Sequence, residues 1–189
     1  MSLDNYRKKR DFAGTPEPEG NKTKGSGGRF VVQKHQATRL HYDFRLQIGD
    51  VLTSWAVPKG PSMDPSVKRL AIQTEDHPLE YRDFEGTIPA DQYGGGTVMI
   101  WDEGRIDWSG TEATPEEMLK KGLLEFELGG EKLRGRFKMV KVRFRNQENA
   151  WLLIKRKDEH AAKTDVLVER PNSARTGRSL EQIAAESDG

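Results

Sequence analysis

The sequence predicts a mainly β fold: an antiparallel β-barrel with one short helix and flexible tails at both ends. Short apolar stretches recur through the middle of the 189-residue chain, turn-forming residues separate them, and only one stretch carries helix signals. Many short strands at such spacing are typical of an antiparallel barrel or a sandwich. The barrel is the expectation, and the sandwich stays open.

The clearest strand covers residues 40–47 (LHYDFRLQ), where apolar and polar side chains alternate with the period of a half-buried strand. A short apolar run at 30–33 (FVVQ) precedes it. Gly49 and Asp50 form a turn signal into 51–58 (VLTSWAVP), so these strands are expected to form a hairpin. Further strands are expected at 69–75, 96–102, 105–110, 123–128, 131–144 and 150–156.

Glycine-containing pairs predict two more hairpin turns, at Glu103-Gly104 and Gly129-Gly130. Within 131–144 the apolar side chains fall at odd positions up to Met139 and at even positions from Val140 onward. A shift of one residue would turn a whole set of side chains to the wrong face of the sheet. We therefore expect a bulge or a sharp bend near these two residues.

One segment, 115–122 (PEEMLKKG), is expected to be a helix of the core. Thr114 is a suitable N-cap, Pro115 occupies the first helical position, and Gly122 is a suitable C-terminal cap. These signals are local and specific, so they predict both ends of the helix.

The ends of the chain differ in composition from its middle. Residues 13–29 contain no large apolar side chain and are rich in glycine, proline and charge, which predicts a linker. We expect a flexible basic arm and linker at 1–29, a barrel domain at 30–157, and a C-terminal tail at 158–189. In that tail, Ser179 and Gln182 have the spacing of a capping box.

Composition excludes several classes of site. The chain has no cysteine, so a disulfide scaffold or thiolate metal site is excluded. The formal net charge of +1 predicts that any binding of phosphate depends on a local basic patch. The sequence has neither the apolar stretch of a signal peptide nor an apolar run of membrane length, and we expect a cytosolic location.

His41, Asp43 and Arg45 are the most informative group, because they share one face of the 40–47 strand. Side chains two residues apart on a strand have Cα atoms about 6–7 Å apart, so an imidazole and a carboxylate can reach one ion. Arg45 offers a rigid fork of donors to a phosphate. The alternative is a polar strand face on which His41 and Asp43 only pair with each other, and the spacing alone favours it.

His35 enters the site only if the chain turns back at 36–39, because six residues of straight strand would place it about 20 Å from His41. Nothing in that stretch is a strong turn signal, so the turn is a prediction. Two imidazoles and one carboxylate suit Mn²⁺, Zn²⁺ or Fe²⁺.

Two other features carry open interpretations. His77 follows an apolar strand and suits a general acid or base, a phosphate donor, or an exposed turn residue, while His160 lies in a polar tail and is given no role. The basic residues Lys141, Arg143 and Arg145 alternate with apolar ones. They form either a groove for a nucleic-acid backbone or a solvated face.

Four long strings resemble the 3′-phosphoesterase module of bacterial DNA ligase D and its stand-alone relatives. They are HQATRLHYDFRL, SWAVPKGPS, EDHPLEYRDFEGTIP and YGGGTVMIWDEG, and the resemblance runs from about residue 30 to 156. The N-terminal YRKKRDF and TPEP are also similar. RTGRSLEQIAA resembles the junction to a following ligase domain, so both a module of a longer protein and a stand-alone protein with a frayed terminus stay open.

The resemblance implies a Mn²⁺-dependent enzyme of non-homologous end joining that acts on 3′ ends of DNA or RNA-tipped primer strands. It would remove a terminal ribonucleoside to leave a 3′-phosphate and then hydrolyse that phosphate to a 3′-hydroxyl. The implied partners are primer-template junctions and the ligase and polymerase domains of the same pathway, with Ku as a further candidate. The implied location is the cytoplasm, in association with the nucleoid.

The resemblance also assigns roles to residues of this chain. The metal ligands would be His35, His41 and Asp43, and the catalytic residues His77, Arg45 and Tyr81. Phosphate would contact Arg45 and His77, with Gln33, Lys59 and Arg69 as further candidates. Residues supporting the diesterase step would be Arg10, Asp11 and Glu17.

Two other functions remain as alternatives. An Fe²⁺ oxygenase on a β-barrel would use a facial triad of His41, Asp43 and His77 and leave His35 unused. A non-catalytic module would bind nucleic-acid ends and recruit partners. Whether His35 or His77 contacts the metal ion distinguishes the oxygenase from the phosphoesterase. Turnover of a 3′-phosphate end distinguishes the phosphoesterase from the non-catalytic module.

Overall fold

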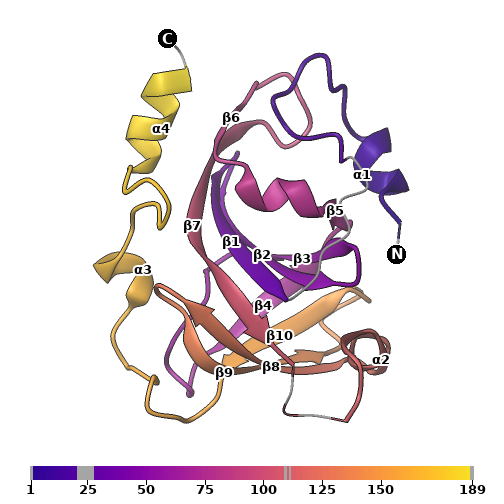
Figure 1. Cartoon of the computed structure of the whole chain (residues 1–189), viewed down its shortest axis with the longest axis vertical. Helices are drawn as coiled ribbons and strands as arrows, with labels where there is room; N and C mark the ends of the chain where they lie inside the picture. The colour runs from indigo at the N-terminus through magenta and orange to yellow at the C-terminus, as the bar shows by residue number, and fades with distance from the viewer. Residues whose placement is uncertain (1, 21–27, 109, 111, 188–189) are drawn as a thin grey trace.

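The computed structural model describes residues 2–20, 28–108, 110 and 112–187 (Figure 1). The predicted linker at 13–29 includes 21–27, which lie outside the described residues. Eight strands form a closed antiparallel ring, because β1 pairs with β2 on one side and with β7 on the other. In ring order they are β1 (Arg29–Gln36), β2 (Leu40–Ile48), β3 (Val51–Val57), β4 (Lys68–Gln73), β10 (Ala150–Lys155), β9 (Arg134–Lys141), β8 (Leu123–Gly130) and β7 (Gly96–Asp107). The predicted barrel is confirmed, and the sandwich is not what forms.

Two short strands extend the ring. β5 (His77–Pro78) pairs with β3, and β6 (Gly86–Ile88) pairs with β7. Between them runs the 3₁₀ helix η1 (Leu79–Asp83). These elements cover one face of the β1–β3 sheet and leave its other face to the barrel core.

Both predicted turns around β2 are present. Ile48 pairs with Val51, so Gly49 and Asp50 form the tight β2–β3 turn, with Gly49 at φ 65°. His35 pairs with His41 across the β1–β2 hairpin. The turn that His35 needed therefore lies where it was expected, within residues 36–39.

The predicted turn at Glu103 and Gly104 is wrong, because β7 runs through both residues without interruption. A Cβ atom at Gly104 would overlap the carbonyl group of Gly129 on the neighbouring strand β8. Glycine is needed here for the close approach of two backbones and not for a turn. One long strand therefore replaces the two predicted ones.

Gly104→Ala is expected to lower the free energy of unfolding by at least about 1–3 kcal/mol, the usual cost of overpacking, because backbone atoms cannot move aside. Gly129→Ala is the matched control, since a Cβ atom there would first meet the carbonyl oxygen of Arg105 at 3.9 Å. Denaturant unfolding of both variants measures the difference. Equal losses would contradict the explanation by close approach.

The β8–β9 turn and the predicted bulge both need correction. Gly129 and Gly130 still belong to β8, and the turn follows at residues 131–133. The register of β9 with both neighbours is continuous through Met139 and Val140, and the strand ends at Lys141. The switch in the apolar pattern therefore reflects the end of a strand, since Phe144 lies beyond it and is exposed.

The predicted helix is α2 (Pro115–Lys121) with the expected caps: Thr114 Oγ1 accepts from Glu117 N, and Gly122 has a left-handed conformation. The capping box is also present, because Ser179 and Gln182 each accept a hydrogen bond from the other's backbone N–H. It begins α4 (Leu180–Ser187). The remaining helices are α1 (Asp4–Lys8) and α3 (Val166–Glu169). No helix in the described ranges is both long and apolar enough to span a membrane.

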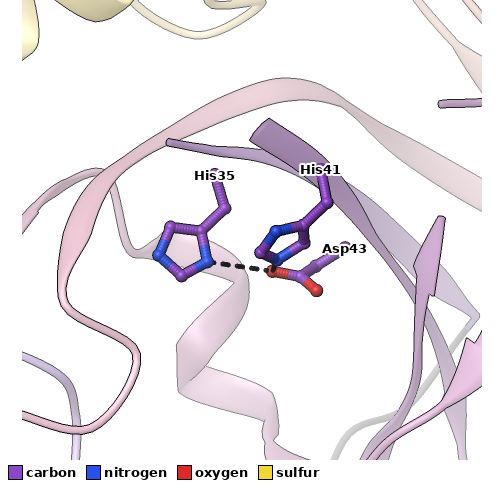
Figure 2. Close-up of side chains that lie close together, drawn as sticks. All are labelled: His35, His41 and Asp43. Atoms are coloured by element: carbon purple, nitrogen blue, oxygen red, sulfur yellow. Dashed lines mark ion pairs between the residues drawn. The ribbon is translucent and has the colours of Figure 1, made fainter. Parts of the chain in front are cut away.

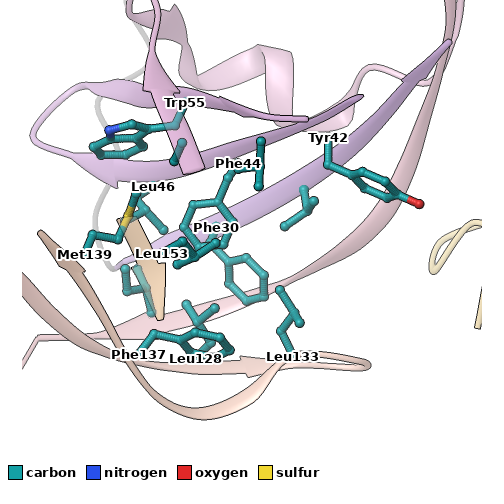
Figure 3. Packing of buried hydrophobic residues seen from close by; sticks show 14 of the residues in the cluster. Phe30, Tyr42, Phe44, Leu46, Trp55, Leu128, Leu133, Phe137, Met139 and Leu153 are labelled. Carbon is teal, nitrogen blue, oxygen red and sulfur yellow. The ribbon is translucent and has the colours of Figure 1, made fainter. Parts of the chain in front are cut away.

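The main core lies inside the ring, where alternate side chains of the strands meet (Figure 3). Phe44 and Leu46 of β2 pack there with Phe137 and Leu153 of the opposite strands. The other face of β1–β3 carries a second cluster, made of Tyr6, Val31, Leu52, Leu79, Tyr81, Phe84, Ile88, Val98 and Ile100. Because side chains alternate along β2, His41, Asp43 and Arg45 share this second face.

Both segments outside the predicted barrel domain contain buried residues. Tyr6 of α1 is fully buried in the second cluster, and Ile183 of α4 is buried against the main one. Trp101 Nε1 donates to the carbonyl oxygen of Arg170, which places the C-terminal segment along β7 (Figure 1). The folded body thus includes residues beyond 30–157, while the division into three segments stays a prediction.

Candidate metal centre and phosphate pocket

Three potential metal ligands meet at the β1–β2 hairpin. The pairing of His35 with His41 sets the two imidazoles side by side, and Asp43 follows on the same face (Figure 2). His35 Nδ1 lies 3.5 Å from Asp43 Oδ2, and His41 Nε2 lies 3.3 Å from the same oxygen. Two atoms each about 2.1 Å from one ion at a tetrahedral angle are about 3.4 Å apart. The spacing therefore fits a single cation.

Backbone carbonyls fix the protonation of both imidazoles. His35 Nε2 lies 2.8 Å from the carbonyl oxygen of Gly94, and His41 Nδ1 lies 3.2 Å from that of Arg39. A carbonyl oxygen only accepts, so these nitrogens carry the protons and the opposite ring nitrogens present lone pairs. Those lone pairs face Asp43 Oδ2, which is also an acceptor. Three acceptors that converge in this way require a cation or a proton between them.

The charges agree with this requirement. Burial alone would raise the pKa of the Asp43 carboxyl, but the charge of Arg45, and the hydrogen bonds of His35 and His41 whenever a proton occupies their facing nitrogens, hold that pKa well below its usual range. Burial also opposes charge on His41, yet the hydrogen bond and the charge of Asp43 leave the pKa of His41 raised. A proton on His41 and a metal ion would therefore compete for one position.

Arg45 is the next residue on this face, and its guanidinium is held in place from two sides. Its Nε donates to Gln33 Oε1 at 2.6 Å, and its guanidinium carbon lies 4.8 Å from the centre of the Tyr81 ring. Its NH2 lies 3.5 Å from Asp43 Oδ2. In the part of the chain that the structure describes, the buried NH1 has no hydrogen-bond partner. A buried, oriented and unsatisfied donor beside a carboxylate is suited to an anionic oxygen.

Gln33, a further candidate for contact with phosphate, bonds to neighbouring elements of the protein. Its side-chain nitrogen donates to the carbonyl oxygens of Tyr81 and Phe84, at 2.9 and 3.0 Å, while its oxygen accepts from Arg45. These bonds link β1 to η1. Gln33 therefore orients Arg45, and its side-chain nitrogen and oxygen are already occupied within the protein.

His77 lines the same cavity as the candidate metal ligands. Its Nδ1 lies 2.9 Å from the carbonyl oxygen of Glu75 and so carries a proton, which leaves the lone pair on Nε2. Burial, together with the charges of Arg45 and Arg10, holds the pKa of His77 well below its usual range. The imidazole is therefore neutral, and Nε2 accepts from Arg10 NH2 at 3.4 Å.

The N-terminal arm completes the pocket. Arg10 donates to Glu17 at 2.8 Å and to Glu75 at 3.4 Å. Glu17 also accepts from the hydroxyl of Tyr81 at 2.7 Å. Burial and the charge of Glu17 raise the pKa of Tyr81, so its phenol stays protonated. The arm thus places a guanidinium next to His77.

These residues surround a cavity of about 230 Å³. Eight of the residues predicted for the site line it: Arg10, Glu17, His35, His41, Asp43, Arg45, His77 and Tyr81. Asp11 is exposed, with its carboxylate bonded to the N–H of Ala13. Lys59 is exposed after β3, and Arg69 is on the same face of β4 as the core residue Ala71. The last three do not line the cavity.

Three contributors were missed from the sequence. Glu75 pairs with Lys9 and Arg10, Tyr6 packs its ring 4.0 Å from the Arg10 guanidinium, and Gly94 orients His35 through its carbonyl group. Glu75 lies two residues before His77 in a polar cluster of the sequence. That cluster indicated the region of the site but not the role of Glu75. A backbone acceptor such as Gly94 leaves no sequence signal.

Comparisons with known proteins point in one direction. The family model described as the DNA ligase D 3′-phosphoesterase domain matches residues 33–141. The multifunctional non-homologous end joining protein LigD of Pseudomonas aeruginosa is 52% identical over 184 residues, which cover 94% of this chain and 22% of that protein. The corresponding proteins of Mycobacterium tuberculosis and Mycolicibacterium smegmatis are 43% identical over 159 residues and 41% identical over 172. These cover 83% and 86% of this chain and 20% and 22% of the two proteins, so the chain spans about a fifth of its relatives.

Proposed function

The chain belongs to the family of DNA ligase D 3′-phosphoesterase domains, and on this basis we propose that it is a metal-dependent hydrolase of phosphoesters at nucleic-acid 3′ ends. One observation supports this most: the lone pairs of His35, His41 and Asp43 converge beside a buried Arg45, one of whose donors has no partner among the described residues. A cation and a guanidinium side by side suit a phosphate, since both neutralise non-bridging oxygens.

We propose Mn²⁺ as the ion, held by His35, His41 and Asp43. Such an ion supplies Lewis-acid stabilisation of the phosphate and lowers the pKa of water. The ligand set also suits Zn²⁺ or Fe²⁺, and the resemblance favours manganese. Other work at the phosphate falls to this chain's own side chains. Arg45 and Arg10 neutralise oxygen charge, and the neutral His77 becomes a proton acceptor at Nε2 once that nitrogen gives up its 3.4 Å contact with Arg10.

The proposed reaction has two steps. In the first, water replaces the 5′ oxygen of a terminal ribonucleoside at phosphorus, so the nucleoside leaves and a 3′-phosphate remains. In the second, water replaces the 3′ oxygen, which leaves a 3′-hydroxyl and inorganic phosphate. Arg10 and Glu17 are proposed to support the first step, because both line the cavity and Arg10 contacts His77 there.

Incubation of the protein with a DNA strand ending in a 3′-phosphate tests the proposal. Release of inorganic phosphate that requires Mn²⁺ and stops with a chelator is the expected result. A second strand ending in a single 3′-ribonucleoside should pass through the 3′-phosphate to the 3′-hydroxyl. Binding of both ends without turnover would identify a non-catalytic end-binding module.

The oxygenase alternative has less support, because the described residues that could share one ion are His35, His41 and Asp43. His77 is not in this group, and both of its ring nitrogens face other partners. The candidate ligand atoms of His35, His41 and Asp43 all come from the β1–β2 hairpin.

The relatives' names place those proteins in non-homologous end joining. We propose the same pathway for this chain, acting on primer-template junctions together with ligase and polymerase domains and with Ku. A cytoplasmic, nucleoid-associated location would follow from action on bacterial DNA ends.

A second surface is proposed as the track of the nucleic-acid backbone. Lys121, Lys141, Arg143 and Arg145 line a shallow groove of about 730 Å³ where β9 ends. At the end of this loop, Asn149 exchanges hydrogen bonds of 2.9 Å with Gln73, next to Thr74 at the wall of the catalytic cavity. The basic residues do not alternate along one strand as predicted, because β9 ends at Lys141. They nevertheless line the same groove.

Lys141→Ala combined with Arg143→Ala is expected to weaken DNA binding and to reduce the slope of log K against log salt concentration by about 1–2, because fewer counterions are released. Lys157→Ala combined with Lys163→Ala removes the same charge from exposed positions beyond the other end of β10 and serves as the control. Titrations at several salt concentrations measure both slopes. Identical slopes for the two double variants would show that the groove is a solvated face.

A further inference from the structure

Tyr93 stands at the mouth of the catalytic cavity. It lines that cavity beside Gly94, whose carbonyl oxygen accepts from His35, so the ring is one residue away from a group that orients a candidate metal ligand. Its side chain is 49% exposed, although the other aromatic residues around the cavity, Tyr6 and Tyr81, are buried. An aromatic ring half open to solvent at a catalytic mouth has a free surface for a ligand.

The loop that carries Tyr93 is held by its backbone. Gln92 N donates to the carbonyl oxygen of Pro89 at 3.0 Å, and Gly95 N donates to that of Gln92 at 3.1 Å. A Cβ atom at Gly96 would overlap the carbonyl group of Gln36, so the loop packs directly against the β1–β2 hairpin. The exposure of Tyr93 therefore comes from its fixed position and not from a loosely attached loop.

Cations surround the inner side of the ring. Lys9 Nζ lies 5.1 Å and the Arg10 guanidinium carbon 5.3 Å from the ring centre, and Lys9 Nζ lies 3.4 Å from the hydroxyl. Arg10 also contacts His77 inside the cavity. Positive charge for a phosphate and a half-exposed aromatic ring thus lie next to each other. Proteins that bind single-stranded nucleic acid combine these two elements, charge for the backbone and rings for the bases.

We infer that Tyr93 stacks on the base of the 3′-terminal nucleotide whose phosphate occupies the catalytic cavity. The inference rests on the proposed function and deepens it, because it makes the base a recognised part of the substrate. Stacking needs only a π-face, so the platform accepts all four bases and selects a nucleotide over a simple phosphate ester. Tyr93 is then a specificity-determining residue, separate from the groups that act on phosphorus.

Four reactions test the inference: wild type and Tyr93→Ala, each on a 3′-phosphate strand with a normal terminal base and on one whose terminal nucleotide is abasic. Stacking contributes about 1–3 kcal/mol per base, so Tyr93→Ala should raise KM about 5- to 150-fold on the normal end with little change in kcat. The wild type should show a similar increase in KM on the abasic end. There, Tyr93→Ala should have no further effect.

Tyr93→Phe is the matched control, because it keeps the ring and removes the hydroxyl that contacts Lys9. It should behave as the wild type on both ends. Equal KM values of the wild type for the two ends would overturn the inference, and so would an equal loss on both ends for Tyr93→Ala. In either case turnover by the wild type would leave the proposed function standing. Failure of the wild type to hydrolyse either end would instead remove the proposed function itself.

Discussion

Asp43→Ala is expected to abolish Mn²⁺-dependent hydrolysis of a 3′-phosphate, and His35→Ala and His41→Ala are expected to do the same. Each substitution removes one of three ligand atoms that lie within 4.8 Å of one another. The Lewis-acid contribution of a metal is worth several kcal/mol, which corresponds to a rate loss of about 10³-fold or more. Phosphate release and Mn²⁺ titration on the same samples measure the two losses together.

The fold should survive these substitutions, because three converging acceptors do not stabilise the protein without an ion. Thermal unfolding in the absence of metal checks this, and Asp43→Asn offers a variant of the same shape. His160→Ala is the control for loss of an imidazole, since His160 is exposed and its imidazole pairs with the exposed Glu159. Full activity of His35→Ala would mean that the three-ligand centre is wrong.

Arg45→Ala and His77→Ala are expected to slow turnover severely while leaving Mn²⁺ binding largely intact. A guanidinium has no lone pair to offer a metal, and His77 is not among the three grouped ligands. Losing one preorganised donor to developing charge typically costs about 10²–10³ in rate. Calorimetric Mn²⁺ titration of each variant, beside single-turnover rates, separates chemistry from metal binding.

Arg45→Lys refines this prediction. The lysine keeps a positive charge beside Asp43. It lacks the planar guanidinium, which bonds Gln33 with one nitrogen and presents another donor to the cavity, so an intermediate rate is expected. A reversal of the metal results would be decisive in the other direction. If His77→Ala loses the ion while His35→Ala retains it, the oxygenase-like triad is correct.

Periodicity predicted the parts of this fold that depend on burial. The alternation in 40–47 gave the strand, its two faces and the common face of His41, Asp43 and Arg45, because one apolar face has to enter the core. Caps predicted both ends of α2 for a similar reason, since they are local hydrogen bonds. Gly104 shows the limit. A glycine in a turn and a glycine under a neighbouring backbone are identical in sequence.

The candidate site was only partly accessible from sequence. The position of His35 opposite His41 depends on a hairpin whose turn has no strong signal, so a family resemblance was needed to place it. Gln33 is polar and near the ligands in sequence, yet its bonds to Tyr81 and Phe84 make it a support for Arg45. The arm that brings Arg10 to His77 packs through Tyr6 and, in part, Phe12, two aromatic residues in a charged segment.

Glu85 joins the C-terminal segment to the catalytic side of the barrel. Its carboxylate accepts from the N–H of Ile100 at 2.8 Å, from Thr176 at 2.7 Å and from Arg178 at 2.8 Å. The preceding residue, Phe84, offers its carbonyl oxygen to Gln33, which in turn orients Arg45. Hydrogen bonds at both ends and the backbone between Glu85 and Phe84 therefore connect Arg178 to the guanidinium of Arg45.

Thermodynamic linkage predicts a measurable coupling between docking of the C-terminal segment and binding at Arg45. If docking of residues 173–178 favours the bound position of Arg45, an anion at Arg45 must favour docking by the same free energy. Occupancy of the cavity should then slow amide hydrogen exchange at the N–H of Ala174, which donates to Ile100, far along the chain from any substrate contact. Tension or a partner acting on the C-terminal segment would, by the same reciprocity, change the affinity for phosphate.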